Sequence, residues 1–345
     1  MRFSRSFWLA CFVFILAVAS QAATTSTAQT TIDAMSRANS AVVGVKVKAV
    51  AQASSAKTLG LNRAGSGVVI GSDGLILTIG YLLLEAETVE IVTQEGRVLP
   101  AVAVAYDLAT GFGLIKPLLP LRGVSPVTLG SLTNLTPNEP LMAAAGAQGA
   151  GALGGMSMTR LVSRRAFSGS WEYHLDTALF TSPPISAGRG NHSGAPLFNG
   201  RGELVGIGSL LVVDALGDNQ RVPGNMFVPI DLLKPILAEL QQSGSSKQSA
   251  RAWLGLTSSD QGGRIQVIRV SEDGPADEAG LTPGTVVLAI DGLEVTTLEA
   301  FYKKLWARDT LDLPIKLTIS AADGVKTIDI KPQNRMLSLK KPAGI

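Results

Sequence analysis

Short apolar stretches separated by turn residues dominate the chain from about residue 41 to residue 228. Residues 41–47 are rich in β-branched valine and partly alternate apolar with polar positions, which predicts a strand. Asp73-Gly74 lies between two such stretches and is typical of a hairpin turn. Further strands are expected at residues 67–70, 75–78, 88–93, 101–105, 114–116 and 204–213. Many short strands at this spacing predict an all-β barrel or sandwich.

A second, smaller unit follows a polar stretch. Residues 229–240 have the apolar spacing of a helix, and residues 241–250, rich in Gln, Ser, Gly and Lys, are predicted to link two domains. Beyond this linker, residues 251–335 are predicted to form a small α+β domain, with residues 336–345 as a C-terminal tail. Its expected elements are strands at 265–270 and 285–290, a short helix within 274–281, a helix at 297–306, and a hairpin of 315–320 with 327–330.

The first 22 residues have the pattern of a signal peptide. Two arginines precede an apolar run at residues 7–19, and small residues at 20 and 22 suit cleavage before Ala23. Cleavage there removes Cys11, the only cysteine, and leaves a chain without thiol chemistry. The alternative is a retained membrane anchor, although the apolar run is short for a span. Residues 23–36 are predicted to be a flexible leader that ends in the start of an N-terminal helix.

Composition narrows the classes of function. The chain of 345 residues is 46% hydrophobic and 17% charged, which is typical of globular domains and not of a disordered chain. Without the two signal arginines, 28 basic residues face 27 acidic ones, and no basic run is present, so nucleic-acid binding is not expected. The sequence has no phosphate-binding loop and no metal-ligand spacing, so we expect neither cofactor nor metal. No later apolar stretch is long enough for a stable membrane span after signal cleavage.

One short stretch carries candidate chemistry. Residues 190–197 read Gly-Asn-His-Ser-Gly-Ala-Pro-Leu, and a serine followed by two small residues, proline and leucine is typical of the nucleophile loop of a chymotrypsin-like protease. A serine hydroxyl is a weak nucleophile near neutral pH and needs a base within hydrogen-bond reach. The reactivity of Ser193 therefore depends on the side chains that the rest of the chain brings to it.

The order of these segments resembles the HtrA family of exported serine proteases. Residues 65–70 and 73–78 are similar to the family's approach to its catalytic histidine, residues 202–207 to the strand after its serine, and residues 274–292 to part of its PDZ domain. The resemblance covers residues 36–335. It implies a mainly β fold: a chymotrypsin-like double six-stranded β-barrel over residues 37–240, a linker over 241–250 and a small α+β PDZ domain over 251–335.

Only one of the family's three catalytic positions keeps its residue. Ser193 stands at the nucleophile position, whereas Tyr81 stands at the histidine position and Gly111 at the aspartate position. A phenol, with an ordinary pKa of about 10, is a poor base near neutrality, and glycine has no side chain with which to orient one. In a well-studied serine protease, loss of the base alone costs about a millionfold in turnover, or ~8–9 kcal/mol. These two positions predict a pseudoprotease, a protease-like protein that does not cleave.

Two histidines are alternative candidates for the base. His192 is adjacent to Ser193, but neighbouring side chains usually diverge, and a loop-packing or solvated histidine is the plainer interpretation. His174 is expected on the surface or partly buried in a strand. Asn191 lies two residues before Ser193, where the family has a glycine whose N–H group contributes to the oxyanion hole. The alternative hypothesis is a divergent serine endopeptidase that uses Ser193 with a non-standard base.

The PDZ resemblance implies a second site. PDZ domains bind a peptide C-terminus as an added strand and hold its carboxylate with backbone N–H groups of a short loop. Trp253, Leu254, Gly255 and Leu256 stand at that loop; alternatively, they are core leucines and a turn glycine. The implied partners are C-terminal or unfolded peptide segments of envelope proteins in the periplasm, with the chain as scaffold, regulator or holdase. The family is commonly trimeric through N-terminal aromatic residues, and residues 23–60 contain none, so a homo-oligomer is expected without a predicted stoichiometry.

Overall fold

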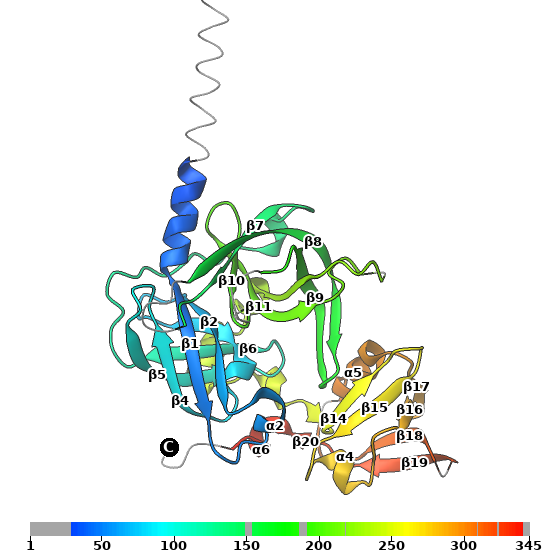
Figure 1. Ribbon diagram of the computed structural model, residues 1–345. Coiled ribbons are helices and arrows are strands. Elements are labelled where there is room, and N and C mark those ends of the chain that lie inside the picture. Colours follow the sequence, from blue (N-terminus) through cyan, green and yellow to red (C-terminus); the bar gives the residue numbers. More distant parts are fainter. Residues whose placement is uncertain are drawn as a thin grey trace, which may run out of the picture.

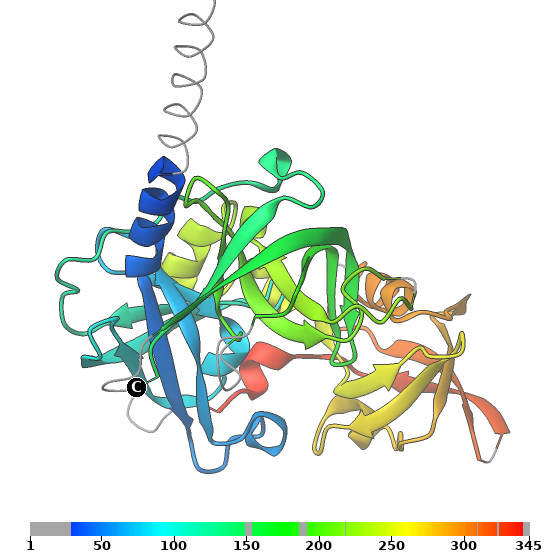
Figure 2. The same cartoon turned by 45° about the horizontal axis from the view of Figure 1, so that its top comes forward.

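The computed structural model describes residues 29–148, 154–185, 192–217, 219–308, 310–322 and 324–340. An N-terminal helix at residues 29–40 leads into a two-barrel domain, and a smaller domain lies against the tip of the long β8–β9 hairpin (Figure 1). A view tilted by 45° shows the same separation into a larger and a smaller body (Figure 2). The predicted signal peptide at 1–22 and the first residues of the predicted leader lie outside the described residues.

The first barrel closes through six antiparallel strands in the order β1-β2-β3-β6-β5-β4. The strands are β1 (Val42–Ala49), β2 (Asn62–Val69), β3 (Ile76–Ile79), β4 (Ala86–Val92), β5 (Val98–Tyr106) and β6 (Phe112–Pro117). The short helix α2 (Ala56–Leu59) lies between β1 and β2, and the 3₁₀ helix η1 (Gly80–Leu83) follows β3. The strands predicted between residues 67 and 116 overlap β2 to β6.

The second barrel also closes through six strands, in the order β10-β11-β12-β9-β8-β7. They are β7 (Pro140–Ala145), β8 (Gly155–Gly169), β9 (Tyr173–Ser182), β10 (Pro196–Phe198), β11 (Leu204–Val212) and β12 (Gly224–Pro229). The 3₁₀ helix η2 (Leu132–Asn134) lies between the barrels in sequence. The predicted double six-stranded barrel is therefore confirmed.

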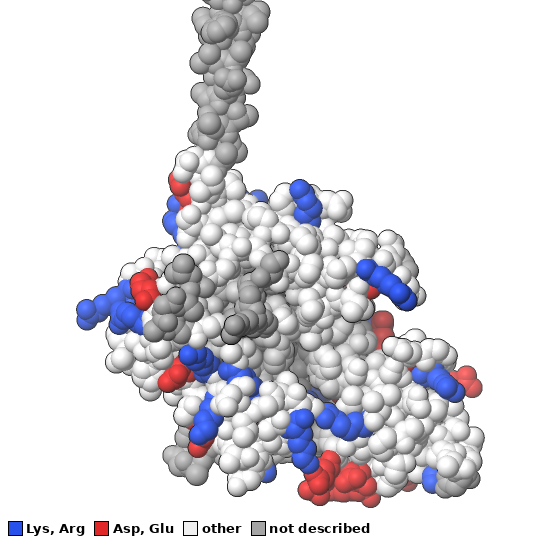
Figure 3. Space-filling model, viewed as in Figure 1, with Lys and Arg blue, Asp and Glu red and all other residues white. Residues whose placement is uncertain are grey.

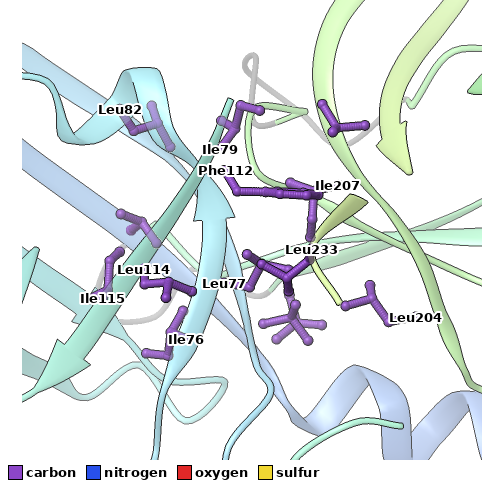
Figure 4. Close-up of a cluster of buried hydrophobic side chains, with 14 of the residues drawn as sticks. Ile76, Leu77, Ile79, Leu82, Phe112, Leu114, Ile115, Leu204, Ile207 and Leu233 are labelled. Carbon is purple, nitrogen blue, oxygen red and sulfur yellow. The ribbon is translucent and has the colours of Figure 1, made fainter. Parts of the chain in front are cut away.

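One apolar core joins the two barrels. Phe112 from the first barrel and Ile207 and Leu233 from the second half are fully buried and belong to one cluster of contacting side chains (Figure 4). Burial of each such side chain contributes about 1.5–3 kcal/mol. The chain has no cysteine beyond Cys11, so this shared core holds the loops between the barrels in place.

The segment between the domains is ordered differently from its predicted pattern. The helix expected at 229–240 is divided into the 3₁₀ helix η3 (Ile230–Leu232) and α3 (Leu237–Ser243). Pro235 lacks an N–H group and is incompatible with a helix interior, so α3 begins only after it. The predicted linker at 241–250 contains the end of α3 and the 3₁₀ helix η4 (Lys247–Ala250), and Ser249 within it is fully buried.

The smaller domain is a sheet in the order β14-β15-β16-β18-β19, with β17 paired to β16. Its strands are β14 (Leu256–Ser259), β15 (Ile265–Val270), β16 (Val286–Ile290), β17 (Leu293–Glu294), β18 (Ile315–Ala321) and β19 (Gly324–Ile330). A separate two-stranded ribbon pairs β13 (Ala252–Trp253) with β20 (Gln333–Asn334). The helices are α4 (Pro275–Glu278), α5 (Leu298–Trp306) and α6 (Arg335–Ser338). This mixture matches the predicted small α+β domain.

The surface agrees with the near-neutral charge of the chain. On the face shown in Figure 3, lysine and arginine side chains lie singly or in small groups, interspersed with acidic ones, and form no continuous basic surface. Among the described residues, no helix combines the length and the apolar character that a membrane crossing requires.

Candidate functional site

Ser193 lies in a hydrogen-bonded turn just before β10. Its carbonyl oxygen accepts a hydrogen bond of 2.8 Å from the backbone N–H of Ser66 in β2. The next residue, Gly194, has a φ of +76° and donates to the carbonyl of Gly208 at 2.7 Å. A Cβ on Gly194 would lie 2.1 Å from the carbonyl oxygen of Ser66, so only glycine fits this turn. The loop fixes the Ser193 hydroxyl between the two barrels.

Tyr81 reaches Ser193 from the other barrel. It lies in η1, directly after β3, and its phenol oxygen is 2.6 Å from Oγ of Ser193. The same phenol donates to the carbonyl oxygen of Ser209 in β11, at 2.8 Å. The structure thus brings together two of the three residues that the resemblance placed at the catalytic positions.

The direction of these hydrogen bonds decides what Tyr81 can do. A phenol has a single proton, and a carbonyl oxygen can only accept, so the bond to Ser209 uses the Tyr81 proton and the Ser193 hydroxyl donates to the phenol oxygen. Burial raises the pKa of Tyr81 to about 12, although the bond from Ser193 opposes the rise. Near neutral pH the phenol therefore stays neutral and cannot accept the serine proton.

Gly111 leaves the aspartate position without a carboxylate, and the side chain of Tyr173 occupies the space beside it. Gly111 has a φ of +82°, in the left-handed region that disfavours side chains. A Cβ built on it would lie 3.1 Å from the hydroxyl oxygen of Tyr173, and that hydroxyl donates to the carbonyl of Thr110 at 2.6 Å. An aspartate at this position would meet both backbone strain and the Tyr173 ring.

Asp107, four residues before Gly111, is the remaining carboxylate of this turn. It is fully buried and accepts hydrogen bonds from Thr110 and from the hydroxyls of Ser246 and Ser249 in the interdomain segment. Burial alone would raise the pKa of Asp107, but these hydrogen bonds outweigh it and the pKa is lowered. Asp107 is therefore an ionised anchor for the interdomain segment and does not orient a base beside Ser193.

Neither histidine bonds to Ser193 in the described part of the chain. The His192 ring is half-buried, and burial lowers its pKa; it makes no hydrogen bond with any described residue. His174 lies in β9, where its Nδ1 is 2.9 Å from the Ser168 hydroxyl and its Nε2 is 3.2 Å from Asp176. His174 thus belongs to the region beside the smaller domain. Asn191 lies outside the described residues.

His174 and Asp176 also meet a carboxylate that is distant in sequence. Their ligand atoms and those of Glu299 in α5 lie within 4.8 Å of one another. The ammonium of Lys303 lies 2.9 Å from Asp176 and 2.8 Å from Glu299. A lysine already neutralises these two carboxylates, so the group acts as an ion-pair contact between the barrel and α5.

The predicted peptide loop contacts the barrel domain directly. Both carboxylate oxygens of Glu172 accept backbone hydrogen bonds: 2.8 Å from Leu254, 2.9 Å from Gly255 and 3.2 Å from Leu256. Gly255 has a φ of +83°, which lets successive N–H groups of the loop converge. The side chains of Leu254 and Leu256 are buried in the core of the smaller domain, and Trp253 pairs with Gln333 in the β13–β20 ribbon. No feature of the sequence near Glu172 pointed to this contact.

Comparison with known proteins identifies the domain type of both parts of the chain. A model of the trypsin-like peptidase domain matches residues 65–207, and a model of the PDZ domain matches residues 252–331. The chain is an HtrA-like protein. The HtrA-like chain has the domain order that its sequence predicted, with Ser193 in the first domain and the Glu172-bound loop in the second.

Curated relatives of this HtrA-like chain are named as serine proteases. The serine endoprotease DegS of Haemophilus influenzae is 27% identical over 242 residues, or 68% of this chain and 67% of the relative. The putative serine protease HhoB of Synechocystis sp. is 27% identical over 248 residues, with 68% and 58% covered. A probable periplasmic serine endoprotease, DegP-like, of Ectopseudomonas mendocina is 27% identical over 241 residues, with 66% and 48% covered. The match thus spans between about half and two thirds of these relatives.

Solved structures share the fold of this HtrA-like chain. The HtrA-type protease AlgW with tripeptide has a TM-score of 0.52 at 20% identity, with 88% of this chain and 96% of that chain covered. The serine endoprotease of Yersinia pestis also has a TM-score of 0.52, at 22% identity, with 88% and 97% covered. At this identity the likeness concerns the fold alone.

Proposed function

We propose that this HtrA-like protein is an exported pseudoprotease that binds peptide C-termini or unfolded segments of envelope proteins through its PDZ domain. Through this binding the protein acts as a scaffold, regulator or holdase, and its barrel domain does not cleave. The periplasm is the proposed location, supported by the signal-like pattern at residues 1–22 and by a relative named as periplasmic.

The contact between Tyr81 and Ser193 carries the proposal. Oγ of Ser193 lies 2.6 Å from an oxygen that cannot take its proton, and the position expected for an orienting carboxylate is Gly111. Proton removal from the serine in the transition state has no acceptor among the described residues that contact it. Loss of the base costs about a millionfold in turnover in a well-studied protease, so a loss of similar size is proposed for this chain.

A divergent serine endopeptidase is the second candidate. Two observations favour it: the relatives are named as serine proteases, and the lowered pKa of His192 keeps its imidazole neutral and able to accept a proton. In this candidate, a rearranged His192 replaces Tyr81 as the acceptor for the Ser193 proton. The two candidates differ in whether Ser193 reacts.

The PDZ domain supports the binding part of the proposal. Its loop presents three converging backbone N–H groups that already hold a carboxylate, namely that of Glu172. Converging N–H groups of this kind bind the terminal carboxylate of a peptide that adds as a strand. The loop chemistry therefore suits a ligand with a free C-terminus.

A reactivity assay separates the two candidates. Wild-type protein and Ser193→Ala are treated with a fluorophosphonate probe and incubated with unfolded casein. We expect no labelling and no cleavage that depend on Ser193. Serine-dependent labelling together with casein cleavage would overturn the pseudoprotease and support the endopeptidase.

A binding assay tests the PDZ part. Labelled peptides with an apolar final residue and either a free or an amidated C-terminus are titrated into wild type and Glu172→Ala. We expect binding that requires the free carboxylate. Equal binding of the amidated peptide would overturn the proposed recognition.

A further inference from the structure

The tip of the β8–β9 hairpin, which belongs to the barrel domain, packs against the PDZ domain at the place where a peptide ligand would bind. The turn between the strands consists of Ser170, Trp171 and Glu172. The backbone N–H of Ser258 in β14 donates to the carbonyl of Ser170 at 2.8 Å. β14 is an edge strand of the PDZ sheet, paired on its other side with β15. The hairpin thus adds a main-chain contact to the free edge of β14, as a bound peptide does.

The side-chain carboxylate of Glu172 binds the N–H groups that would hold the terminal carboxylate of a peptide. Only 4% of Glu172 is exposed, and its two oxygens accept from the N–H groups of Leu254, Gly255 and Leu256. A C-terminal peptide would present its carboxylate oxygens to the same donors. Both carboxylates cannot occupy these N–H groups at once.

A positive φ and a tyrosine from α5 hold Glu172 in this position. Glu172 has a φ of +58°, a left-handed conformation that is uncommon outside glycine, asparagine and aspartate. Its backbone N–H donates to the phenol oxygen of Tyr302 at 3.1 Å, and the Tyr302 phenol donates to the carbonyl of Gly169 at 2.8 Å. Tyr302 therefore fixes both ends of the turn. The local strain is stored at the point of contact between the two domains, as is common at switchable sites.

From these contacts we infer that Glu172 is an internal ligand of the PDZ loop, and that a peptide C-terminus binds only by displacing it together with the hairpin tip. This inference rests on the proposed function of the loop as a peptide-carboxylate site and adds its regulation. The fraction of molecules with an undocked hairpin then sets the apparent affinity for peptide.

Displacement of the hairpin tip would also affect the packing of the first barrel. Tyr173 follows Glu172 directly, and its hydroxyl donates to the carbonyl of Thr110 beside Gly111. Its ring stacks on Trp171 with a centroid distance of 5.9 Å. Movement of the hairpin tip would therefore disturb the packing around Gly111, whose carbonyl accepts a hydrogen bond of 2.7 Å from Gly80, the residue before Tyr81.

A comparison of variants of the full chain tests the inference. The probe is a fluorescently labelled decapeptide of glycine and serine that ends in two valines, with a free or an amidated C-terminus. Glu172→Ala removes the internal carboxylate. Glu85→Gln is the matched control, because Glu85 is also buried, has a φ of +55°, and bonds Ser54, Ser55 and Lys340 instead of the PDZ loop.

We expect Glu172→Ala to bind the free-carboxylate peptide at least about tenfold more tightly than wild type, and Glu85→Gln to bind like wild type. If Glu172→Ala and wild type bind it equally, the internal-ligand role is overturned while the proposed peptide binding stands. If no variant distinguishes the free from the amidated peptide, the proposed binding function fails and the inference with it.

Hydrogen exchange on wild type avoids any effect of a substitution on folding. Addition of the free-carboxylate peptide should increase exchange in residues 169–173 and leave the amides of Leu254 and Gly255 protected. Peptide binding without a change in exchange of the hairpin tip would contradict displacement.

Discussion

The phenol oxygen of Tyr81 lies 2.6 Å from Oγ of Ser193 and accepts a hydrogen bond from it, at the position where a protease has the histidine that takes the serine proton. An acceptor is therefore present at the right distance, but it has the wrong basicity. The site therefore differs from one in which the serine has no hydrogen-bond acceptor beside it. Replacement of residue 81 can test whether the weak basicity of this acceptor causes the proposed loss of reactivity.

Replacement of that acceptor should change the reactivity of Ser193. We expect Tyr81→His to raise the rate of fluorophosphonate labelling by about tenfold or more, because an imidazole can accept the serine proton, while the missing carboxylate at Gly111 keeps the rate far below that of an intact triad. Tyr81→Phe, which removes only the hydroxyl, should label no faster than wild type. Labelling of wild type at the rate of Tyr81→His would indicate that a base other than residue 81 acts on Ser193. Ser193→Ala in the Tyr81→His background is the blank.

The crowding around Gly111 predicts an effect on stability. Gly111→Ala should destabilise the fold by about 2–3 kcal/mol, of which ~1–2 kcal/mol is the cost of a left-handed alanine and the rest its contact with Tyr173. Gly123→Ala is the matched control, because Gly123 has a φ of +75° and no atom within 4 Å of its added Cβ. Urea unfolding of both variants measures the difference. Equal losses would show that Tyr173 does not crowd the position.

The barrels could be predicted because their signals are local, and the same local signals led to Tyr81 and Ser193, whose side chains meet in the structure. Short apolar runs between turns follow from the two-residue period of a strand, and the Ser193, Tyr81 and Gly111 positions lie at fixed offsets from recognisable strands. The helix expected at 229–240 was wrong in part because Pro235 outweighed the apolar spacing.

The contacts between domains could not be predicted. Glu172 and the loop residue Leu254 are 82 positions apart, and Asp107 and Ser246 are 139 positions apart. Nothing in the spacing of polar residues indicates which distant N–H or hydroxyl group a carboxylate will meet. Glu172, within Trp-Glu-Tyr-His, reads like an exposed turn residue until the fold places it against the PDZ loop.

Asp107 should make the barrel domain sensitive to acid. Its pKa is lowered in the folded chain, so its contribution is present above the ordinary aspartate pKa of about 3.9 and is lost as the pH falls below that value. Asp107→Asn should cost about 2–3 kcal/mol at pH 7, since a buried amide cannot replace an acceptor of several hydrogen bonds. The difference from wild type should shrink below about pH 4. Chemical unfolding at both pH values measures it, with Asp329→Asn, at an exposed position of β19, as the control.

The raised pKa of Glu172 predicts that peptide binding depends on pH. Burial raises the pKa of Glu172 to about 7, although the bonds from Leu254 and Gly255 oppose the rise. Free glutamate has a pKa of about 4.3, so the hairpin takes up a proton on docking between these two values. Docking is therefore strongest at low pH and weakens as the pH rises towards 7, whereas the peptide carboxylate, with a pKa of about 3.5, stays ionised throughout.

The charged and titratable groups around Glu172 are Arg335, Arg251 and Tyr302, and Arg251 also donates to the Glu172 carbonyl. Neither Arg251 nor the buried phenol of Tyr302, whose pKa is raised, titrates near pH 7. Wild type should therefore bind the free-carboxylate peptide roughly tenfold more tightly at pH 8 than at pH 6. Glu172→Gln should show no such change, and His174→Gln, which removes the histidine of the same hairpin, should keep it. Fluorescence anisotropy at the two pH values decides: a pH dependence that persists in Glu172→Gln but disappears in His174→Gln would assign the titration to the histidine and refute the role of Glu172.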